Sequence, residues 1–401
     1  MTEAGIVTVA GPGSWWAWAG LRLTPTTPDA PSVQPAPPPI ADHLGGTVNQ
    51  FAGSARHVVQ ARDVHGGVHF HAAQAQERPP DVLPWLRTWW QAAVGPGAAV
   101  ELRLLNQPGG AGLAAFALLR TSAPDQLTAI ETAARLRAGL PAGLSFLRAE
   151  PVDSEATLHG LLAPFTPHRL GLVEIRKRLT VARSTRGDAR WPWLAAVTPL
   201  TGDAVSWQPM WAELAALPAP ALLSVRLAPV RIGPGLRAHL AAQAGEFARL
   251  AQPGSPPTAT WAVPRPPDEF AVAAAPLCSA AVSRYTEAAF AIRVSLASAA
   301  PLPDALPVLL ADTISPARPG SGFLGDAPVV VRPAGADRLG VAWQNITALN
   351  ADPVGPVEPD GVPAEALSEV ARVLVTTADL HEAAALFRPP YRSETAPNLF
   401  G

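Results

Sequence analysis

Cysteine and lysine are almost absent from this chain, and charged residues are scarce. The single cysteine, Cys278, excludes an internal disulfide and a zinc site built from several thiolates. The single lysine, Lys177, follows no glycine-rich loop, which excludes a Walker A site and ATP hydrolysis by a P-loop mechanism. Charged residues make up 15% of the 401 residues, against about 25% in an average protein. A weakly charged surface is therefore expected.

Net charge and hydropathy exclude further classes of protein. The net charge is −2, whereas nucleic-acid-binding proteins carry an excess of basic residues that neutralise phosphates, so no nucleic-acid partner is expected. No run of about 18 apolar residues is present, and no membrane-spanning helix is predicted. The first residues lack the basic region that is typical of a signal peptide. These features predict a cytoplasmic protein without a membrane partner.

Proline is abundant, with 46 residues, and it divides the chain into segments. Residues 24–40 are so rich in proline that they predict an extended linker rather than a helix or a paired strand. The predicted organisation is a Trp-containing segment with a proline-rich linker (1–44), a β-prone segment (45–71), a second linker (72–82), two α+β lobes (83–200 and 201–390) and a tail (391–401).

Strand and helix patterns alternate beyond the second linker and predict an α+β fold. Strands are predicted at Val100–Leu105 and Leu113–Arg120, a helix follows to about Ala138, and another strand is predicted at Leu144–Arg148. This β-β-α-β order is half or more of a ferredoxin-like unit. A similar order returns in the second half, with a helix over Pro234–Leu250. We expect two ferredoxin-like lobes, preceded by a disordered N-terminal arm that carries a short β-prone motif.

Tryptophans cluster near the N-terminus, at Trp15, Trp16 and Trp18. One interpretation is a strand or hairpin packed on the main body, in which Trp15 and Trp16 point to opposite faces. The other is a segment that docks at a membrane interface or on a partner, where tryptophan is enriched.

Candidate catalytic groups form no recognisable constellation. Cys278 lies among apolar residues, which predicts a buried and unreactive thiol. His159, His168 and His239 are dispersed and are expected to be structural or exposed. No Gly-x-Ser-x-Gly nucleophile motif is present. We predict no enzymatic activity and no cofactor, and an unrecognised enzyme remains a third hypothesis.

Residues 45–71 differ in composition from the rest of the chain. Apolar and polar residues alternate, proline is absent, and Gly53, Gly66 and Gly67 permit tight bends between short strands. This composition is typical of a cross-β stack, in which each chain pairs its backbone with identical copies above and below. The segment alone cannot bury enough apolar surface to fold, so it is expected to be disordered in the monomer.

The segment also resembles a known family. The runs Asn49-Gln-Phe-Ala-Gly53, Val58-Val-Gln-Ala61 and Asp63-Val-His-Gly-Gly-Val-His-Phe-His71 resemble the bacterial amyloid signalling motifs of actinobacteria, which are similar to the RIP homotypic interaction motif. Val59-Gln60-Ala61 matches the shared apolar-Gln-apolar core, and Arg62 stands where glycine is usual. The resemblance implies a homo-oligomer formed through 45–71. It also implies a protein partner with the same motif, either a sensor of the NLR type or an effector.

In such a stack Gln60 would form an amide ladder, while valines and Phe70 would form dry interfaces. The predicted motif residues are Asn49, Gln50, Phe51, Gly53, Val58, Val59, Gln60, Ala61, Val64, Gly66, Gly67, Val68 and Phe70. A local hairpin on the globular body is an alternative. A metal site is another, with His65, His69 and His71 as candidate ligands, but no acidic third ligand lies in register and no metal is predicted.

The leading functional hypothesis is a non-enzymatic adaptor or effector of a bacterial immunity or programmed-death pathway, assembled through residues 45–71. A second hypothesis comes from Ala378–Tyr391, which resembles the segment before the motor domain of helicase-like and conjugative-transfer ATPases. Tyr285–Leu296 also resembles a strand from their N-terminal modules. This resemblance implies a motorless accessory subunit of an ATPase complex, with 45–71 as a tether. Neither pattern assigns an activity to residues 83–390.

Overall fold

A computed structural model gives the fold of most of the chain. It describes residues 4–26, 80–95, 97–110, 112–201, 207–255, 264–317, 324–325, 327–357, 359, 361–392 and 399–400. The elements and contacts below belong to these residues.

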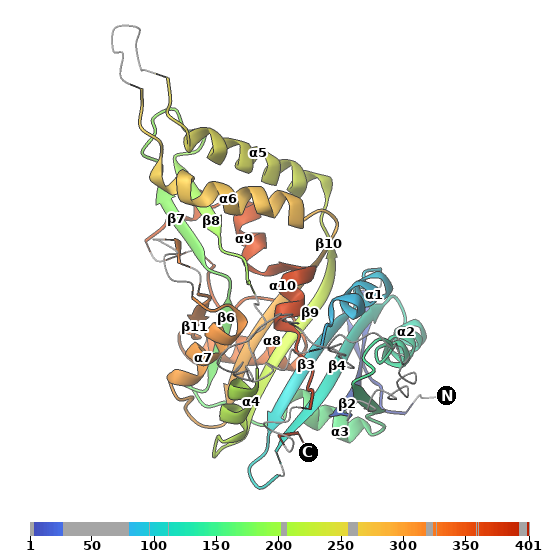
Figure 1. Cartoon of the computed structure of the whole chain (residues 1–401). Helices are drawn as coiled ribbons and strands as arrows, with labels where there is room; N and C mark the ends of the chain where they lie inside the picture. Colours follow the sequence, from blue (N-terminus) through green and yellow to red (C-terminus); the bar gives the residue numbers. More distant parts are fainter. Residues whose placement is uncertain are drawn as a thin grey trace, which may run out of the picture. The chain divides into compact units, whose positions relative to one another are not determined.

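The central feature is a ten-stranded antiparallel sheet (Figure 1). Eight of its strands lie in the order β1 (Val7–Gly11), β2 (Ser14–Pro25), β4 (Leu113–Ala123), β3 (Ala99–Asn106), β9 (Ala221–Arg231), β10 (Ala288–Ser298), β6 (Leu172–Arg176) and β11 (Val329–Val331). In addition, β5 (Leu147–Pro151) pairs with β2, and β12 (Thr377–Asp379) pairs with β10. A separate two-stranded sheet consists of β7 (Leu179–Arg183) and β8 (Trp193–Val197).

Helices cover both faces of the main sheet. The apolar face packs against α1 (Leu83–Ala93), α2 (Gln126–Gly139), α4 (Gln208–Ala215), α7 (Ala305–Ile314) and α10 (Leu380–Leu386). The opposite face packs against α3 (Glu155–Leu162) and α8 (Ala336–Thr347). The β7–β8 sheet packs against α5 (Pro234–Leu250), α6 (Glu269–Arg284) and α9 (Glu369–Val375), and Figure 1 shows α5 and α6 side by side. A short 3-10 helix, Ala364–Ala366, precedes α9.

The central strands alternate apolar and polar residues, yet both of their faces are buried. In β3, Leu102 joins the apolar layer, whereas Glu101 and Arg103 point to the side of α3 and α8 and are fully buried. Buried polar groups need hydrogen-bond partners, because leaving them unpaired costs free energy. Arg103 donates to the carbonyl of Leu162 at 2.9 Å and to that of Ile346 at 3.0 Å. Carbonyls in the last turns of α3 and α8 therefore accept hydrogen bonds from Arg103 on the polar face of the sheet.

The N-terminal tryptophans belong to this sheet. Strands β1 and β2 form a hairpin, and β2 also pairs with β4. Trp15 packs against the core on one face of the sheet and Trp16 against the core on the other. This confirms the interpretation as a hairpin packed on the main body. Residues 4–26 are thus part of the sheet and not of an arm that precedes it.

The α+β class is confirmed, but the ferredoxin-like lobes are not. The predicted β-β-α-β order is present as β3, β4, α2 and β5. However, β5 pairs with the N-terminal strand β2, with Leu23 opposite Ala149. Strand β3 pairs with β9, with Leu102 opposite Val225, so strands from the ranges 83–200 and 201–390 share one sheet.

Candidate functional site

The residues that the sequence assigns to the assembly motif lie outside the described part of the chain. This holds for all of them, from Asn49 to Phe70, and for the metal candidates His65, His69 and His71. Their placement therefore stays a prediction. The folded body offers other candidate sites, in its buried charges, crevices and polar networks.

The single lysine lies in a buried ion-pair cluster that joins several parts of the fold. Nζ of Lys177 lies 2.9 Å from a carboxylate oxygen of Glu382 in α10. It also donates to Tyr285 Oη and to the carbonyl of Thr377, both at 2.7 Å. Tyr285 Oη donates to Glu382 at 2.5 Å, and the Leu200 N–H donates to the other carboxylate oxygen at 2.9 Å. Lys177 thus uses all three of its donors.

The environment of this cluster indicates a structural role. Burial lowers the pKa of Lys177, and the charge of Glu382 opposes that shift. Burial disfavours ionisation of Glu382, but Lys177 and Arg284 outweigh it and hold the pKa of the carboxyl below its usual range. The space beside Lys177 has a volume of about 20 Å³, which is enough for about one water molecule and for no substrate. We therefore assign the cluster a role in stabilising the fold and no role in binding a substrate.

A crevice beside β8 combines aromatic walls with polar groups. It has a volume of about 230 Å³ and lies between β8, α5 and the turn at residues 365–368. The ring of Trp191 stacks on that of His239, with 6.0 Å between the centroids. Gln243 and Phe247 of α5 complete the wall that faces β8. The volume lies below the roughly 300–1,000 Å³ of most small-molecule sites, so it suits one large side chain.

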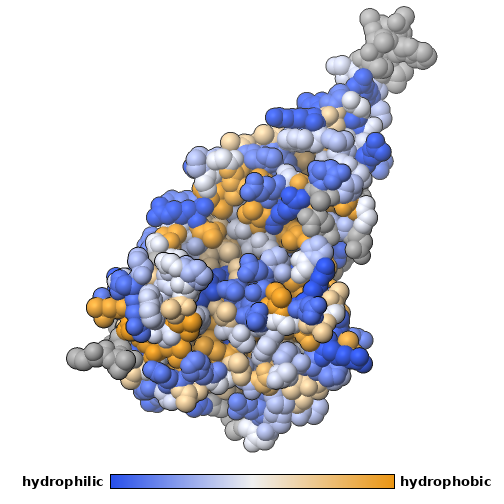
Figure 2. Space-filling model, turned by 180° about the vertical axis from the view of Figure 1, so that it is seen from behind, coloured by the Kyte–Doolittle hydropathy of each residue, from blue (hydrophilic) through white to orange (hydrophobic). Residues whose placement is uncertain are grey.

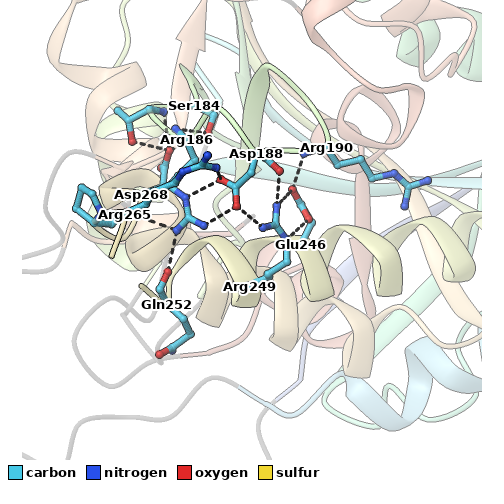
Figure 3. Close-up of polar contacts among 11 residues, drawn as sticks. Ser184, Arg186, Asp188, Arg190, Glu246, Arg249, Gln252, Arg265 and Asp268 are labelled. Carbon is cyan, nitrogen blue, oxygen red and sulfur yellow. Dashed lines mark hydrogen bonds and ion pairs between the residues drawn. The ribbon is translucent and has the colours of Figure 1, made fainter. Parts of the chain in front are cut away.

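A polar network near this crevice is centred on Asp188 (Figure 3). Its carboxylate lies 2.7 Å from Arg186, 3.0 Å from Arg249 and 3.4 Å from Arg265. Hydrogen bonds from Arg186 and then from Arg249 hold the pKa of Asp188 well below its usual range, against the opposing effect of burial. One carboxylate therefore links the β7–β8 loop to α5 and to the segment that leads into α6.

The network also fixes the loop that carries Trp191. The backbone N–H of Arg190 donates to Glu246 of α5 at 2.7 Å. On the other side, Asp268 accepts from the Ser184 hydroxyl at 3.0 Å and caps α6. The loop is tied to both helices, which holds Trp191 against His239 at the mouth of the crevice. No local sequence signal marks this arrangement.

The other predicted histidines do not gather at a site. His159 is exposed on α3, and His168 is half-buried and accepts a hydrogen bond from the Leu170 N–H at 3.1 Å. No group of three or more histidine, cysteine or acidic residues in the described ranges is arranged to hold a metal ion.

The sequence matches no protein-family model and none of the curated proteins. Among the helices of the described residues, none is long and apolar enough to cross a membrane. On the face shown in Figure 2, hydrophobic residues are interspersed with hydrophilic ones. The exposed large apolar side chains are spread over several elements, such as Val9 on β1, Leu127 on α2 and Val308 on α7. Scattered residues of this kind are normal on protein surfaces.

Replacing the centre of the polar network is expected to destabilise the protein modestly. Asp188→Asn removes the charge that three arginines share, but the side chain is 30% exposed and solvent screens its interactions. We expect the melting temperature to fall by about 2 °C, and by less at high salt.

The effect of Asp188→Asn should also depend on pH, because the pKa of Asp188 is depressed in the folded state. The difference in melting temperature between the variant and the wild type is complete above the ordinary aspartate pKa of about 3.9 and disappears as the pH falls below it. Asp312→Asn serves as the control, because Asp312 is exposed and forms no ion pair with the described residues. An equal shift in both variants would contradict the assignment.

The thiol of Cys278 is expected to be unreactive in the folded protein. It packs in the core between α5, α6 and β8 and is 9% exposed, and burial raises its pKa to about 12. Iodoacetamide should therefore label Cys278 only after denaturation, as peptide mass spectrometry would show. Labelling of the native protein at the rate of the denatured chain would contradict the burial.

Ionisation of the same thiol should also lower stability at alkaline pH. The folded-state pKa of about 12 exceeds the ordinary value of 9.0, so its contribution is complete below pH 9 and is lost between pH 9 and 12. The difference between the folded-state pKa and the ordinary pKa of the thiol corresponds to about 4 kcal/mol of unfolding free energy. In urea titrations, Cys278→Ala should lose less stability than the wild type across this range. A parallel decline in both proteins would show that the thiol does not contribute.

Proposed function

We propose that this chain is a non-enzymatic signalling protein that assembles through residues 45–71. In this proposal it is an adaptor or effector of a bacterial immunity or programmed-death pathway. Its partner carries the same motif on a sensor of the NLR type. The observation that carries the proposal is the ordered recurrence of Gln60, Gly66-Gly67 and His69-Phe-His71 in a proline-free, alternating segment between two linkers.

The position of the segment in the chain supports this division of roles. Strand β2 ends at Pro25 and α1 begins at Leu83, and both pack in the same core. The motif therefore lies in a connection between two elements of one folded body. A body with its own core can be carried by an assembling segment without contributing to the stack. Residues 27–44 join the body to the motif on one side, and residues 72–82 join it on the other.

Seeding tests the proposal directly. Fibres of a synthetic 43–73 peptide are added to the full-length chain at neutral pH, and thioflavin T fluorescence and electron microscopy follow assembly. We expect the seeds to remove the lag phase, because a cross-β end templates identical segments. Fibres of an unrelated amyloid peptide are the control and should leave the lag unchanged. A full-length chain that stays monomeric with both seeds would reject the proposal.

A genomic neighbour gives a second discriminating observation. A neighbouring gene for an NLR-type protein that ends in the same His-Phe-His run favours homotypic signalling. A neighbouring motor ATPase favours the accessory-subunit hypothesis, in which the segment is only a tether.

A further inference from the structure

The outer edge of β8 is not paired with another strand in the described part of the chain. Two backbone hydrogen bonds flank the ladder between β7 and β8: the Thr198 N–H donates to the Arg178 carbonyl and the Ser184 N–H to the Pro192 carbonyl, each at 2.9 Å. Hydrogen-bonded and non-hydrogen-bonded pairs alternate along an antiparallel ladder. Trp193 and Ala195 therefore direct their backbone N–H and C=O groups away from β7.

One contact confirms this direction. The side-chain amide of Gln243 in α5 donates to the outward carbonyl of Ala195 at 2.9 Å. Among the described residues, no hydrogen bond uses the N–H of Trp193 or of Ala195. Ala195 is 7% exposed as a whole residue, and it lines the adjacent crevice. A backbone donor without a protein partner at this position gains a hydrogen bond when an acceptor enters the crevice.

The crevice opens at this edge. Trp193 and Ala195 form one side of it, and Phe247 and Leu367 provide apolar surface. The carboxylate of Glu365 lies at an exposed position on the rim. The space of about 230 Å³ fits one large apolar side chain, and free strand-edge groups border it. This combination of main-chain donors and a side-chain pocket is how extended peptides are recognised when they add to a sheet edge.

We propose that the edge of β8 and the adjacent crevice bind an extended peptide segment of a partner protein. The segment pairs its backbone with Trp193 and Ala195 and inserts one large apolar side chain between Trp193 and Phe247. A second copy of this chain cannot bind here by pairing its own β8 with this edge. Helix α9 closes the edge near Val197, where Ala371 and Leu374 leave a space of only about 20 Å³. The remaining free stretch is too short for two β8 strands to pair symmetrically. The proposal does not depend on residues 45–71.

The test begins with a phage-displayed random dodecapeptide library selected on the immobilised full-length protein. A selected peptide is then synthesised, and its affinity for the wild type and for two variants is measured by calorimetry. Ala195→Pro removes the outward N–H, and proline is tolerated where a strand edge makes no ladder bond. We expect about a tenfold loss of affinity with little change in melting temperature.

The second variant should change affinity in the opposite direction. Gln243→Ala frees the carbonyl of Ala195 for the peptide and widens the crevice, so affinity should rise several-fold. This variant leaves the β8 backbone intact and keeps the proposal testable even if Ala195→Pro fails to fold. Nuclear magnetic resonance should also show that peptide binding slows hydrogen exchange at the amide of Ala195. Peptides that bind both variants as they bind the wild type would overturn the proposal, as would a selection that yields none.

Discussion

Glu101→Gln is expected to lower the free energy of unfolding by about 3–5 kcal/mol, the range for breaking a buried ion pair from one side. Glu101 is fully buried on the polar face of the sheet. One carboxylate oxygen accepts from Arg103 Nε at 2.7 Å, and the other accepts from Arg293 Nη2 at 2.7 Å. The substitution keeps the shape of the side chain but removes the charge that both guanidinium groups face.

The surroundings of Glu101 make its charge difficult to replace. Glu101 and Glu174 are the carboxylates buried among the arginines of this face. The five arginines buried on this face are Arg103, Arg120, Arg176, Arg226 and Arg293. Burial, followed by the charges of Arg293 and Arg120, lowers the pKa of Arg226 to about 9. The carbonyls at the ends of α3 and α8 supply only partial negative charge. Without Glu101, buried positive charge is left without its nearest counter-charge.

An exposed ion pair of the same kind provides the matched control. Glu150 lies 2.7 Å from Arg148, but the two side chains are 48% and 71% exposed. Glu150→Gln should therefore change the free energy of unfolding by no more than about 1 kcal/mol. Urea denaturation followed by circular dichroism measures both variants. Equal effects at the two positions would contradict the account of the buried face.

Gln60→Asp is expected to abolish assembly of the full-length chain. In a parallel in-register stack, identical residues lie about 4.7–4.8 Å apart, so the substitution places a carboxylate above a carboxylate along the whole fibre. At this spacing two like charges repel by roughly 0.9 kcal/mol in water and by roughly 3.5 kcal/mol at an effective dielectric constant of 20. The variant also lacks the amide group that would donate to the next copy in the ladder.

A second glutamine separates this effect from a general effect of charge. Gln74 lies in the linker at 72–82, and Gln74→Asp introduces the same charge outside the motif. Thioflavin T fluorescence and electron microscopy should show fibres for the wild type and for Gln74→Asp, and none for Gln60→Asp. Fibres from Gln60→Asp would show that Gln60 does not form the ladder.

Local features of the fold follow from the sequence. Helix α5 spans Pro234–Leu250 as predicted, because Pro234 suits the first helical position and alanines favour the helix. The opposite faces of Trp15 and Trp16 follow from the two-residue period of a strand. The sequence pattern does not predict helix α6, because the helix contains Pro276 and the proline-rich residues before it indicate a loop. The sequence signal for its start is Asp268, whose side chain caps the helix.

Long-range arrangement does not follow from local pattern. The pairing of β3 with β9 joins residues that are more than 100 positions apart, and no local feature specifies it. Glu101 and Arg103 alternate with leucines, a pattern that does not reveal the helices that bury them. The crevice likewise depends on Trp191 and His239, which meet only because the Asp188 network fixes the loop on α5. The assembly motif, in contrast, is a sequence prediction throughout, since its residues lie outside the described part of the chain.

X-ray fibre diffraction from the seeded full-length chain shows whether residues 45–71 stack as cross-β strands. We expect a meridional reflection at about 4.7–4.8 Å and an equatorial one at about 10 Å, which are the two spacings of a cross-β structure. Both reflections should be absent from a Gln60→Asp sample prepared in the same way. A wild-type sample that stays monomeric in sedimentation velocity and gives neither reflection, even with peptide seeds, would contradict assembly through residues 45–71.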